Sequence, residues 1–357
     1  MTRLAYLNQD PGIAPGAMKG AAVHVAAMRA AFEQAGAQLV AIDEPDSQRA
    51  SSALEAAHAV APIDLVFERY ALGARAGARF CRTRAVALVL EVNAPLLDEA
   101  SVHRGRGPGA LDFACEREVF EAASCILTVS NQVAGYVNSR GIDPRKLRVR
   151  PNAVDTQRFA PLVDRGAARR ALGLESSFVL GFHGRLRPWH GFERIAAVTA
   201  RMRQCGIPAH VLTLGAGDFA SALRACLPAA AFTTLPWVAH EQVGRTVGCF
   251  DALALAYSPQ SPCYFSPLKL LEAMACGVVP VVPSLGDLPE IVHDGHDGLV
   301  YAAHEDDGMF RALAALAADP SLRERLAAQA ARSAAGRSWI AIAKEVLSLV
   351  ARPAASA

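Results

Sequence analysis

The amino-acid sequence predicts an α/β protein of two doubly wound, Rossmann-like domains, each a parallel sheet with helices on both faces. The chain has 357 residues, and chains longer than about 250–300 residues divide into domains. Short β-rich runs alternate with helical stretches, a pattern typical of parallel sheets. The alternation occurs in two series, before and after a proline-containing stretch at 148–164 that resembles a linker. Two series predict two sheets.

Each expected strand is a short run rich in Val, Leu, Ile and Ala. In the first series the expected strands are 4–7, 38–42, 64–67, 87–92 and 125–129. In the second series they are 178–182, 210–214, 232–235, 252–256, 278–282 and 299–301. Helical patterns separate nearly all of these runs, so consecutive strands are expected to be parallel.

Three segments follow from this organisation. Residues 1–155 are expected to form an N-terminal Rossmann-like domain, and residues 156–336 a C-terminal one. Residues 337–357 contain an amphipathic helix, which we expect to pack back on the N-terminal domain. Open parallel sheets bind ligands at the carboxyl ends of their strands. Two sheets facing each other therefore predict a ligand site in the cleft between the domains.

The composition excludes several classes of protein. Apolar residues make up 52% of the chain and charged residues 20%, as in globular proteins with large cores. The net charge of +2 gives no basis for nucleic-acid binding, which requires a more basic surface. The sequence shows neither a signal-peptide pattern nor an apolar run long enough to span a membrane. Its eight cysteines form no CxxC pair, so we expect reduced thiols in a cytoplasmic protein.

The first chemical motif is the segment 181–192, GFHGRLRPWHGF, which follows the first strand of the second series. A glycine-rich turn that opens a helix offers backbone N–H groups to a diphosphate. Arg185 adds a guanidinium that can bind two phosphate oxygens at once. An ordinary strand-to-helix turn with a solvated arginine explains the same residues, so this motif alone leaves both interpretations open.

The second motif is the segment 266–277, SPLKLLEAMACG. Pro267 stands where a helix begins and Gly277 where it ends. The N-terminus of that helix favours an anion, and Lys269 lies in its first turn. Glu272 lies one turn later, where a carboxylate would accept hydrogen bonds from a ribose diol beside the phosphates. The alternative is a structural helix in which Glu272 only caps.

Together these two segments resemble the donor-site motifs of the retaining GT-B glycosyltransferases, glycosyltransferase family 4 (glycosyl transferases group 1). Three further segments are similar to family signatures: 151–155 (PNAVD) to the hinge region, 286–292 (GDLPEIV) to the C-terminal donor signature, and 15–20 to the first loop. Each match alone is weak. In the family's order, however, they span nearly the whole chain.

The resemblance implies a role for each matching residue. Arg185 would contact the donor diphosphate, Glu272 the ribose hydroxyls, and Gly20 would approach the diphosphate from the first domain. The backbone amides from Leu268 to Leu271 would meet the phosphates and the sugar. The full set of catalytic candidates is Arg185, Lys269, Glu272 and Asn93. The donor-binding candidates are Gly20, Gly184, His190, Trp237, Val238, Tyr264, Ser266, Pro267, Leu268, Leu270 and Leu271, with Trp237 and Val238 beside the nucleobase.

Three positions depart from the family pattern. His190 stands where the family usually has a phosphate-binding lysine, and the charge of a histidine depends on pH. Tyr264 stands where the family has the first glutamate of a pair, which contacts sugar hydroxyls. Many relatives carry a histidine after a strand of the first domain, and here Asn93, or less closely Glu91, takes that position.

The expected activity is transfer of a sugar from a nucleotide-diphosphate sugar to a hydroxyl acceptor, with the anomeric configuration retained. The first domain would bind the acceptor and the second the donor. The resemblance implies neither a metal nor another cofactor, and the sequence contains no Asp-x-Asp triplet. Glycans, glycolipid intermediates and small molecules all remain open as acceptors.

A lipid-linked acceptor would bring the enzyme to a membrane surface. Arg75, Arg79 and Arg82 share one helical face, because they are spaced four and then three residues apart. Such a face can meet anionic lipid headgroups, but a solvated face is the favoured interpretation.

Two alternatives of other classes remain. The segment 215–220, GAGDFA, matches the dinucleotide fingerprint G-x-G-x-x-A and suggests an NAD(P)-dependent oxidoreductase. The acidic residue expected about 20 positions later is missing. The other alternative is a catalytically inactive GT-B subunit, which the departures at His190 and Tyr264 suggest and the retained Arg185, Lys269 and Glu272 oppose.

Overall fold

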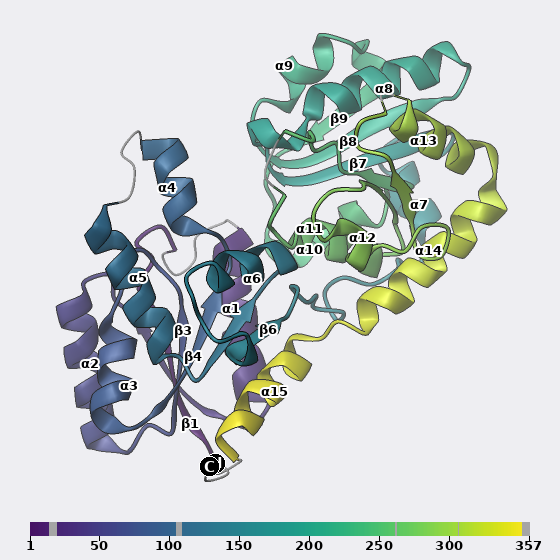
Figure 1. The fold of residues 1–357 in the computed structure, drawn as a ribbon. Coiled ribbons are helices and arrows are strands. Elements are labelled where there is room, and N and C mark those ends of the chain that lie inside the picture. Colours follow the sequence, from purple (N-terminus) through teal and green to yellow (C-terminus); the bar gives the residue numbers. More distant parts are fainter. Residues whose placement is uncertain (14–19, 105–108, 261–262, 306, 352–357) are drawn as a thin grey trace. The chain divides into compact units, whose positions relative to one another are not determined.

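A computed structural model describes residues 1–13, 20–104, 109–260, 263–305 and 307–351 (Figure 1). The chain forms two compact units. Unit 1 comprises Met1–Asn152, Tyr264–Ser266 and Trp339–Ala357, and unit 2 comprises Ala153–Cys263 and Pro267–Ser338. The divisions therefore fall at Asn152 and Ser338 rather than at 155 and 336, and the short segment Tyr264–Ser266 belongs with unit 1.

Unit 1 contains a six-stranded parallel sheet of order β2-β1-β3-β4-β5-β6. Its strands are β1 (Arg3–Asn8), β2 (Gln38–Asp43), β3 (Leu65–Arg69), β4 (Ala87–Val92), β5 (Cys125–Thr128) and β6 (Leu147–Val149). The order doubles back at β1, as expected of a doubly wound sheet. The last strand, β6, was not predicted, because it has only three residues and lies in the stretch interpreted as a linker.

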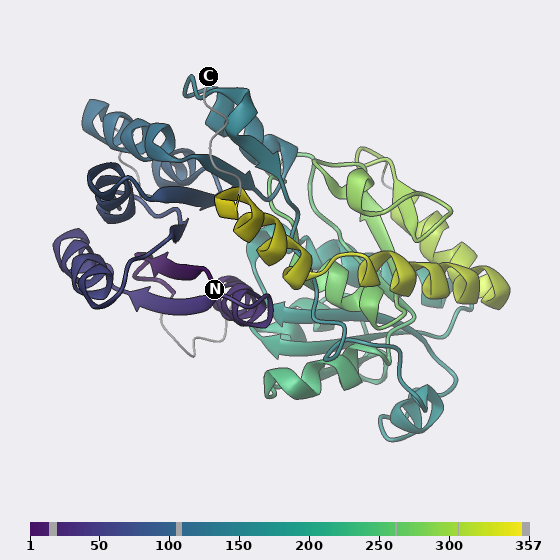
Figure 2. The same ribbon diagram turned by 90° about the horizontal axis from the view of Figure 1, so that it is seen from below.

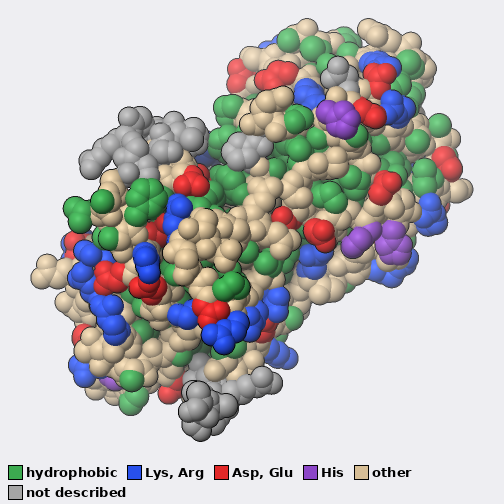
Figure 3. Space-filling view, in the orientation of Figure 1, with side chains coloured by type: hydrophobic (Ala, Val, Ile, Leu, Met, Phe, Trp, Pro, Cys, Tyr) green, Lys and Arg blue, Asp and Glu red, His purple; other side chains and the backbone are tan. Residues whose placement is uncertain are grey.

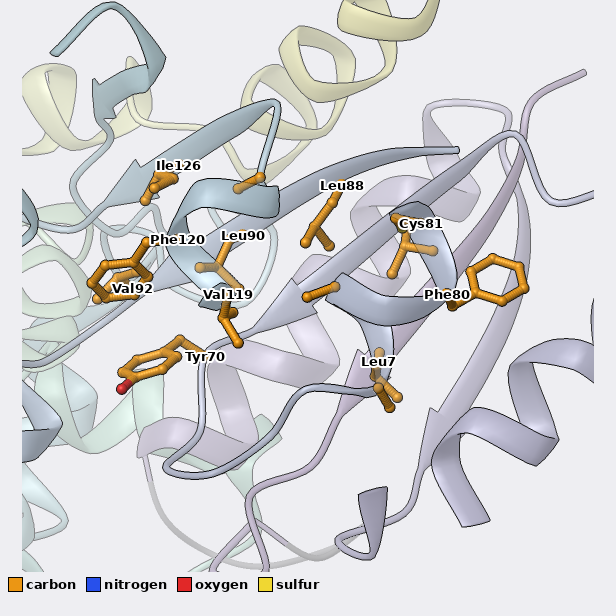
Figure 4. Packing of buried hydrophobic residues seen from close by; sticks show 14 of the residues in the cluster. Leu7, Tyr70, Phe80, Cys81, Leu88, Leu90, Val92, Val119, Phe120 and Ile126 are labelled. Carbon is orange, nitrogen blue, oxygen red and sulfur yellow. The ribbon is translucent and has the colours of Figure 1, made fainter. Parts of the chain in front are cut away.

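Helices cover both faces of this sheet. They are α1 (Gly20–Gln34), α2 (Ser47–Val60), α3 (Ala76–Arg84), α4 (Leu96–Arg104), α5 (Ala110–Ala122), α6 (Asn131–Asn138), the 3-10 turn η1 (Pro144–Lys146) and α15 (Trp339–Ala351). A core of buried side chains joins the sheet to α2, α3, α5 and α6, with Phe80, Phe120 and Leu90 among its members (Figure 4).

The C-terminal helix α15 packs on α1 within unit 1 (Figures 1 and 2). The ring of Trp339 meets His24 of α1 edge to face, with 4.8 Å between ring centroids. Farther along α15, Glu345 accepts two hydrogen bonds of 2.6 Å from the guanidinium of Arg150. A bidentate pair of this kind is directional, so it fixes the orientation of the helix as well as its contact.

Unit 2 contains the second six-stranded parallel sheet, of order β12-β11-β10-β7-β8-β9. Its strands are β7 (Phe178–Arg185), β8 (Ala209–Ala216), β9 (Phe232–Leu235), β10 (Ala252–Ala254), β11 (Val279–Pro283) and β12 (Leu299–Tyr301). Its helices are α7 (Arg165–Arg170), α8 (Phe192–Gln204), α9 (Phe219–Arg224), α10 (His240–Val247), α11 (Leu268–Ala275), α12 (Leu288–Ile291), α13 (Gly308–Ala318) and α14 (Pro320–Ala335), with 3-10 turns η2 (Pro188–His190) and η3 (Ala229–Ala231).

The predicted fold class is confirmed, because every expected strand is present and both sheets are parallel. Among the described helices, none is both long enough and apolar enough to cross a bilayer. On the face drawn in Figure 3, basic and acidic side chains are interspersed, in keeping with the small net charge.

The first residues of two glycine-rich segments belong to strands rather than to turns. Strand β7 continues through Gly184 to Arg185, and β8 continues through Gly215 to Ala216, because these residues pair with one another in register. Gly215 has φ +144°, and a Cβ on it would lie 2.1 Å from the carbonyl oxygen of Gly184. The glycines of 215–217 therefore allow close packing of β7 and β8. This packing accounts for the glycines without a bound dinucleotide.

One buried carboxyl in unit 1 lacks a partner. Glu68 on β3 is fully buried, and neither of its carboxyl oxygens has a hydrogen-bond partner among the described residues. It fits beneath α3 because residue 77 is a glycine, whose Cβ would lie 2.0 Å from Glu68 Oε2. Burial raises the pKa of Glu68 from its ordinary 4.5 to about 8.

This raised pKa predicts a falling stability with rising pH. The contribution of Glu68 to the free energy of unfolding is fully present below pH 4.5 and is lost as pH rises through about 8. Between pH 4.5 and 8.5 the wild type should lose stability relative to Glu68→Gln by on the order of 4 kcal/mol. Urea unfolding at several pH values measures this difference.

The matched control is Glu33→Gln, at an exposed position on α1. Its stability should follow the wild-type pH curve. Parallel curves for wild type and Glu68→Gln would show that Glu68 does not titrate abnormally.

Candidate functional site

A buried hydrogen bond in unit 2 joins the two predicted donor motifs. Nε2 of His183 on β7 lies 2.7 Å from Oε2 of Glu272 on α11. Their residues are 4% and 9% exposed, respectively. The contact sets α11 against the end of β7. The structure thus brings together residues that lie 89 positions apart in the sequence, as the resemblance implies.

Helix α11 forms where the sequence predicts it. Pro267 precedes its first residue, and Gly277, with φ +71°, follows its end. Leu270, Leu271 and Met274 are fully buried and anchor the helix to unit 2. Glu272 is buried beside this apolar face of the helix. Its hydrogen bond to His183 offsets the cost of burying a carboxylate there.

One predicted ligand of the phosphates is already engaged. The backbone N–H of Leu270 donates to the carbonyl oxygen of Pro267 at 3.0 Å, so it is not available to a ligand. Leu271 lies one residue deeper, where an N–H bonds within the helix. The prediction of amides from Leu268 to Leu271 is therefore too broad, and Leu268 and Lys269 are the candidates that remain.

Lys269 points back from α11 toward η2. Its Nζ lies 3.1 Å from Nε2 of His190 and 4.1 Å from the centre of the Phe182 ring. Burial lowers the pKa of Lys269 to about 7, against the opposing effect of Glu272. The residue still keeps a partly exposed surface.

His190 is buried in η2, with its ring against Phe182. Its Nδ1 accepts a hydrogen bond of 3.1 Å from the backbone N–H of Arg187. Burial, with Lys269 and Arg187, lowers the pKa of His190 to about 3. The expectation that its charge varies near neutral pH is corrected, because burial is the main cause of this lowered pKa and favours the neutral ring.

Arg185 lies at the end of β7 with its side chain exposed. It has no ion-pair or hydrogen-bond partner within the described part of the chain. This free guanidinium, two residues after His183, is available to an anion. Gly184, before it, takes φ +104°, a conformation that favours glycine.

The other donor-binding candidates of unit 2 are Trp237 and Val238. They follow β9 and are both partly exposed. Their surfaces are open to a ligand, and their role beside a nucleobase stays a prediction.

Tyr264 and Ser266 lie with unit 1, which corrects their placement in the second domain. The Tyr264 hydroxyl donates a short hydrogen bond to Glu99 of α4, and Ser130 Oγ donates to the Tyr264 carbonyl oxygen. Ser266 Oγ accepts from the backbone N–H of Asn152 at 3.0 Å. These contacts hold the segment Tyr264–Ser266 to unit 1 although it directly precedes α11.

Unit 1 has a buried polar cluster around Glu91, at the end of β4. Asn93 donates to Glu91 Oε2 at 2.9 Å, Arg69 contacts the same oxygen at 3.2 Å, and His24 Nε2 lies 2.7 Å from Oε1. Although burial opposes it, His24 and Arg69 lower the pKa of Glu91 to about 2. The Glu91 carboxylate thus orients the side-chain amide of Asn93.

His24 is central to this cluster, and no motif in the sequence points to it. Its Nδ1 lies 2.9 Å from Oδ1 of Asn152, whose amide nitrogen donates to the Ser266 carbonyl oxygen at 2.6 Å. The second bond fixes which amide atom faces His24. Gly20, the first residue of the same helix α1, is exposed. The predicted first-loop residues Pro15, Gly16 and Lys19 lie outside the described residues.

The arginine face suggested for lipid contact has a partner within unit 1. Arg75, Arg79 and Arg82 contact the carboxylate of Glu118 on α5 at 3.5, 3.7 and 3.1 Å. Together they lower the pKa of Glu118, although burial opposes this shift. One carboxylate partly neutralises the face, which agrees with the favoured interpretation.

Comparison with protein families gives two matches. Residues 20–158 match the family model "Glycosyltransferase Family 4", and residues 177–319 match "Glycosyl transferases group 1". The first match lies mainly in unit 1 and the second in unit 2. Together they cover most of the chain.

Several curated relatives carry the name D-inositol 3-phosphate glycosyltransferase. The protein from Actinosynnema mirum is 32% identical over 238 residues, which cover 63% of this chain and 56% of the relative. The one from Kineococcus radiotolerans is 27% identical over 323 residues, covering 84% and 73%. In the strongest matches, the chain spans little more than half the length of the relative.

Solved structures show the same fold. Anabaena Alr3699/HepE, in complex with UDP and glucose, has a TM-score of 0.75 at 17% identity, and the match covers 98% of this chain and 99% of that one. Sucrose-phosphate synthase from Thermosynechococcus elongatus has a TM-score of 0.76 at 18% identity, covering 97% and 98%.

The backbone that carries His190 yields a prediction about stability. Gly191 follows His190 with φ +62°, and a Cβ on it would lie 2.0 Å from the Ala256 carbonyl oxygen. Gly206 has a similar φ of +81° with open space around it. We expect Gly206→Ala to cost about 1–2 kcal/mol for the left-handed conformation, and Gly191→Ala at least about 2 kcal/mol more through the clash.

Urea unfolding of both variants measures this difference in the free energy of unfolding. Equal losses would show that the contact between residue 191 and the Ala256 carbonyl does not constrain η2.

Proposed function

This chain belongs to the GT-B glycosyltransferases of family 4 and group 1, and on that premise we propose that it moves a sugar from a nucleoside-diphosphate sugar to a hydroxyl acceptor. The transfer would retain the anomeric configuration and need no metal ion. The observation that carries this proposal is the bond between His183 and Glu272, which sets Lys269 and Glu272 of α11 against β7, the strand that ends at Arg185.

The arrangement suits a nucleoside diphosphate. Arg185 and Lys269 provide cations for phosphate oxygens, and the first turn of α11 provides backbone N–H groups. Glu272 uses Oε2 for His183, which leaves Oε1 to accept a ribose hydroxyl. A carboxylate held in place in this way can select a diol without repelling the phosphates one helical turn away.

The chemistry follows from charge placement. The bond between the anomeric carbon and the diphosphate breaks, a bond to the acceptor oxygen forms, and the hydroxyl proton passes to a phosphate oxygen of the leaving group. Negative charge grows on the diphosphate as it leaves. Arg185 and Lys269 would stabilise that charge, and fixed groups do so without reorganising.

The acceptor would bind to unit 1, near the Glu91 cluster. Asn93 and Glu91 lie at the carboxyl end of β4, where parallel sheets bind ligands. The curated relatives are named for an inositol phosphate acceptor, so a phosphorylated polyol is the first acceptor to test. UDP is present in the HepE complexes, which makes UDP-sugars the first donors.

Neither alternative has a specific observation in its favour. Gly215 and Gly217 are explained by packing against Gly184 and Leu186, and the acidic residue that the dinucleotide fingerprint requires is missing from the sequence. An inactive subunit would be expected to lose the cations, and both Arg185 and Lys269 remain at the site.

Thermal denaturation with UDP, GDP, ADP, TDP and NAD, each with and without a metal chelator, tests the donor assignment. A ligand that binds only the folded state raises its apparent stability. We expect one nucleoside diphosphate to raise the melting temperature whether or not the chelator is present. Arg185→Ala should weaken its binding roughly 10- to 100-fold, the cost of losing charge-assisted hydrogen bonds.

The matched control is Arg170→Ala, at an exposed position on α7, which should bind as the wild type does. Stabilisation by NAD alone would favour the oxidoreductase. A lack of stabilisation by every nucleotide would contradict a donor site in this chain.

Retention has its own test. With the UDP-sugar or other donor that the screen identifies, proton NMR of the first product should show the same anomeric configuration as the donor. An inverted product would rule out the retaining mechanism while leaving the donor site intact.

A further inference from the structure

The contact between Lys269 and His190 places two nitrogen atoms 3.1 Å apart in unit 2. The separation suits a hydrogen bond, in which one nitrogen must donate and the other accept. A lysine ammonium has only donors, and the proton of a neutral imidazole resides on one of two nitrogens. The hydrogen bonds around His190 therefore decide the protonation state of Lys269.

The other nitrogen of His190 identifies the tautomer. Nδ1 accepts from the backbone N–H of Arg187 at 3.1 Å, so it carries a lone pair and not a proton. A neutral ring then has its proton on Nε2, and this N–H points at Lys269 Nζ. An ammonium cannot accept that bond, whereas a neutral amine can. The geometry fits an uncharged Lys269.

The surroundings of the amine agree. The face of the Phe182 ring lies 4.1 Å from the amine and excludes water from it, and the same ring face attracts the ammonium once it forms. Glu272, one turn along α11, is the one nearby carboxylate among the described residues, and His183 engages one of its oxygens. On the opposite side are His190, the cation of Arg187 and the ring of Tyr257, 6.2 Å from His190. Burial lowers the pKa of Lys269 to about 7, so a small change in its surroundings changes its charge near neutral pH.

We propose that Lys269 and His190 form a proton-accepting pair, in which Lys269 takes up one proton from solvent when the diphosphate of the donor binds. The inference rests on the proposed function, because it assigns these two residues to the same phosphates. The lone pair of Lys269 Nζ gains the proton, and the amine becomes an ammonium facing the anion. His190 then loses its acceptor, and its Nε2–H is free to donate to a phosphate oxygen.

Two residues thus share the role that a single lysine has in the family. His190 occupies that position in the sequence and supplies a neutral donor, while Lys269 supplies the charge from α11. The empty protein avoids a buried cation, which is costly without a partner. The charge develops only with the anion that compensates it. Both residues act here as positioning and binding groups.

Isothermal titration calorimetry measures the proton directly. UDP, GDP, ADP and TDP are each titrated into the full chain at pH 8, in HEPES and in Tris, which differ in ionisation enthalpy. The dependence of the observed enthalpy on the buffer gives the protons taken up. With a pKa of about 7 for Lys269, we expect about 0.9 proton for each diphosphate bound at pH 8.

Two variants isolate Lys269 from the ligand's own ionisation. Lys269→Arg carries a charge at every accessible pH, so it should bind the diphosphate with no proton uptake. Lys269→Met is uncharged and fills the apolar contact with Phe182. It should bind more weakly, again without uptake.

The outcomes separate the two proposals. Binding with proton uptake in the wild type and none in Lys269→Arg or Lys269→Met supports the pair. Binding without uptake in the wild type, or uptake that persists in both variants, overturns the pair and leaves the glycosyltransferase proposal standing. If none of the four diphosphates binds the wild type, both proposals fail together.

Discussion

The hydrogen bond between His183 and Glu272 is the constraint on which the site in unit 2 depends. Strand β7 ends with the exposed cation of Arg185, and the first turn of α11 carries the amine of Lys269. Neither segment alone distinguishes a ligand site from an ordinary turn or helix. The buried bond places both against the same edge of the sheet. The Glu272 carboxylate would be costly to bury without a partner, and its bond to His183 links the two motifs.

The chain departs from its family at two positions, and in both cases another element supplies a polar partner. His190 replaces a lysine, and Lys269 of α11 lies within hydrogen-bond distance of it. Tyr264 replaces a glutamate, and its hydroxyl bonds to Glu99 of α4. Each replacement is thus linked to a charged side chain from a neighbouring element. Both replaced residues thus have polar partners within the fold, and neither replacement gives support to an inactive subunit.

Local patterns predicted most of the fold. Strand periodicity located every strand except β6, whose three residues carry too little pattern, and Pro267 with Gly277 marked both ends of α11. Contacts between distant residues were not predictable. His24 lies 67 positions from Glu91, and Tyr264 belongs to unit 1 and bonds to Glu99 although the residues before it in the chain belong to unit 2. Strand β7 is also longer than predicted and ends at Arg185. Glycine occurs both in turns and where strands pack closely, so Gly184 alone did not distinguish the two.

A crystal structure of the chain with its nucleoside diphosphate tests the central claim most directly. We expect phosphate oxygens within about 3.2 Å of Lys269 Nζ, His190 Nε2 and the Arg185 guanidinium, with the ribose hydroxyls bound to Glu272. A nucleotide bound elsewhere, such as in the turn after β8 beside Gly217, with those three groups untouched, would contradict it.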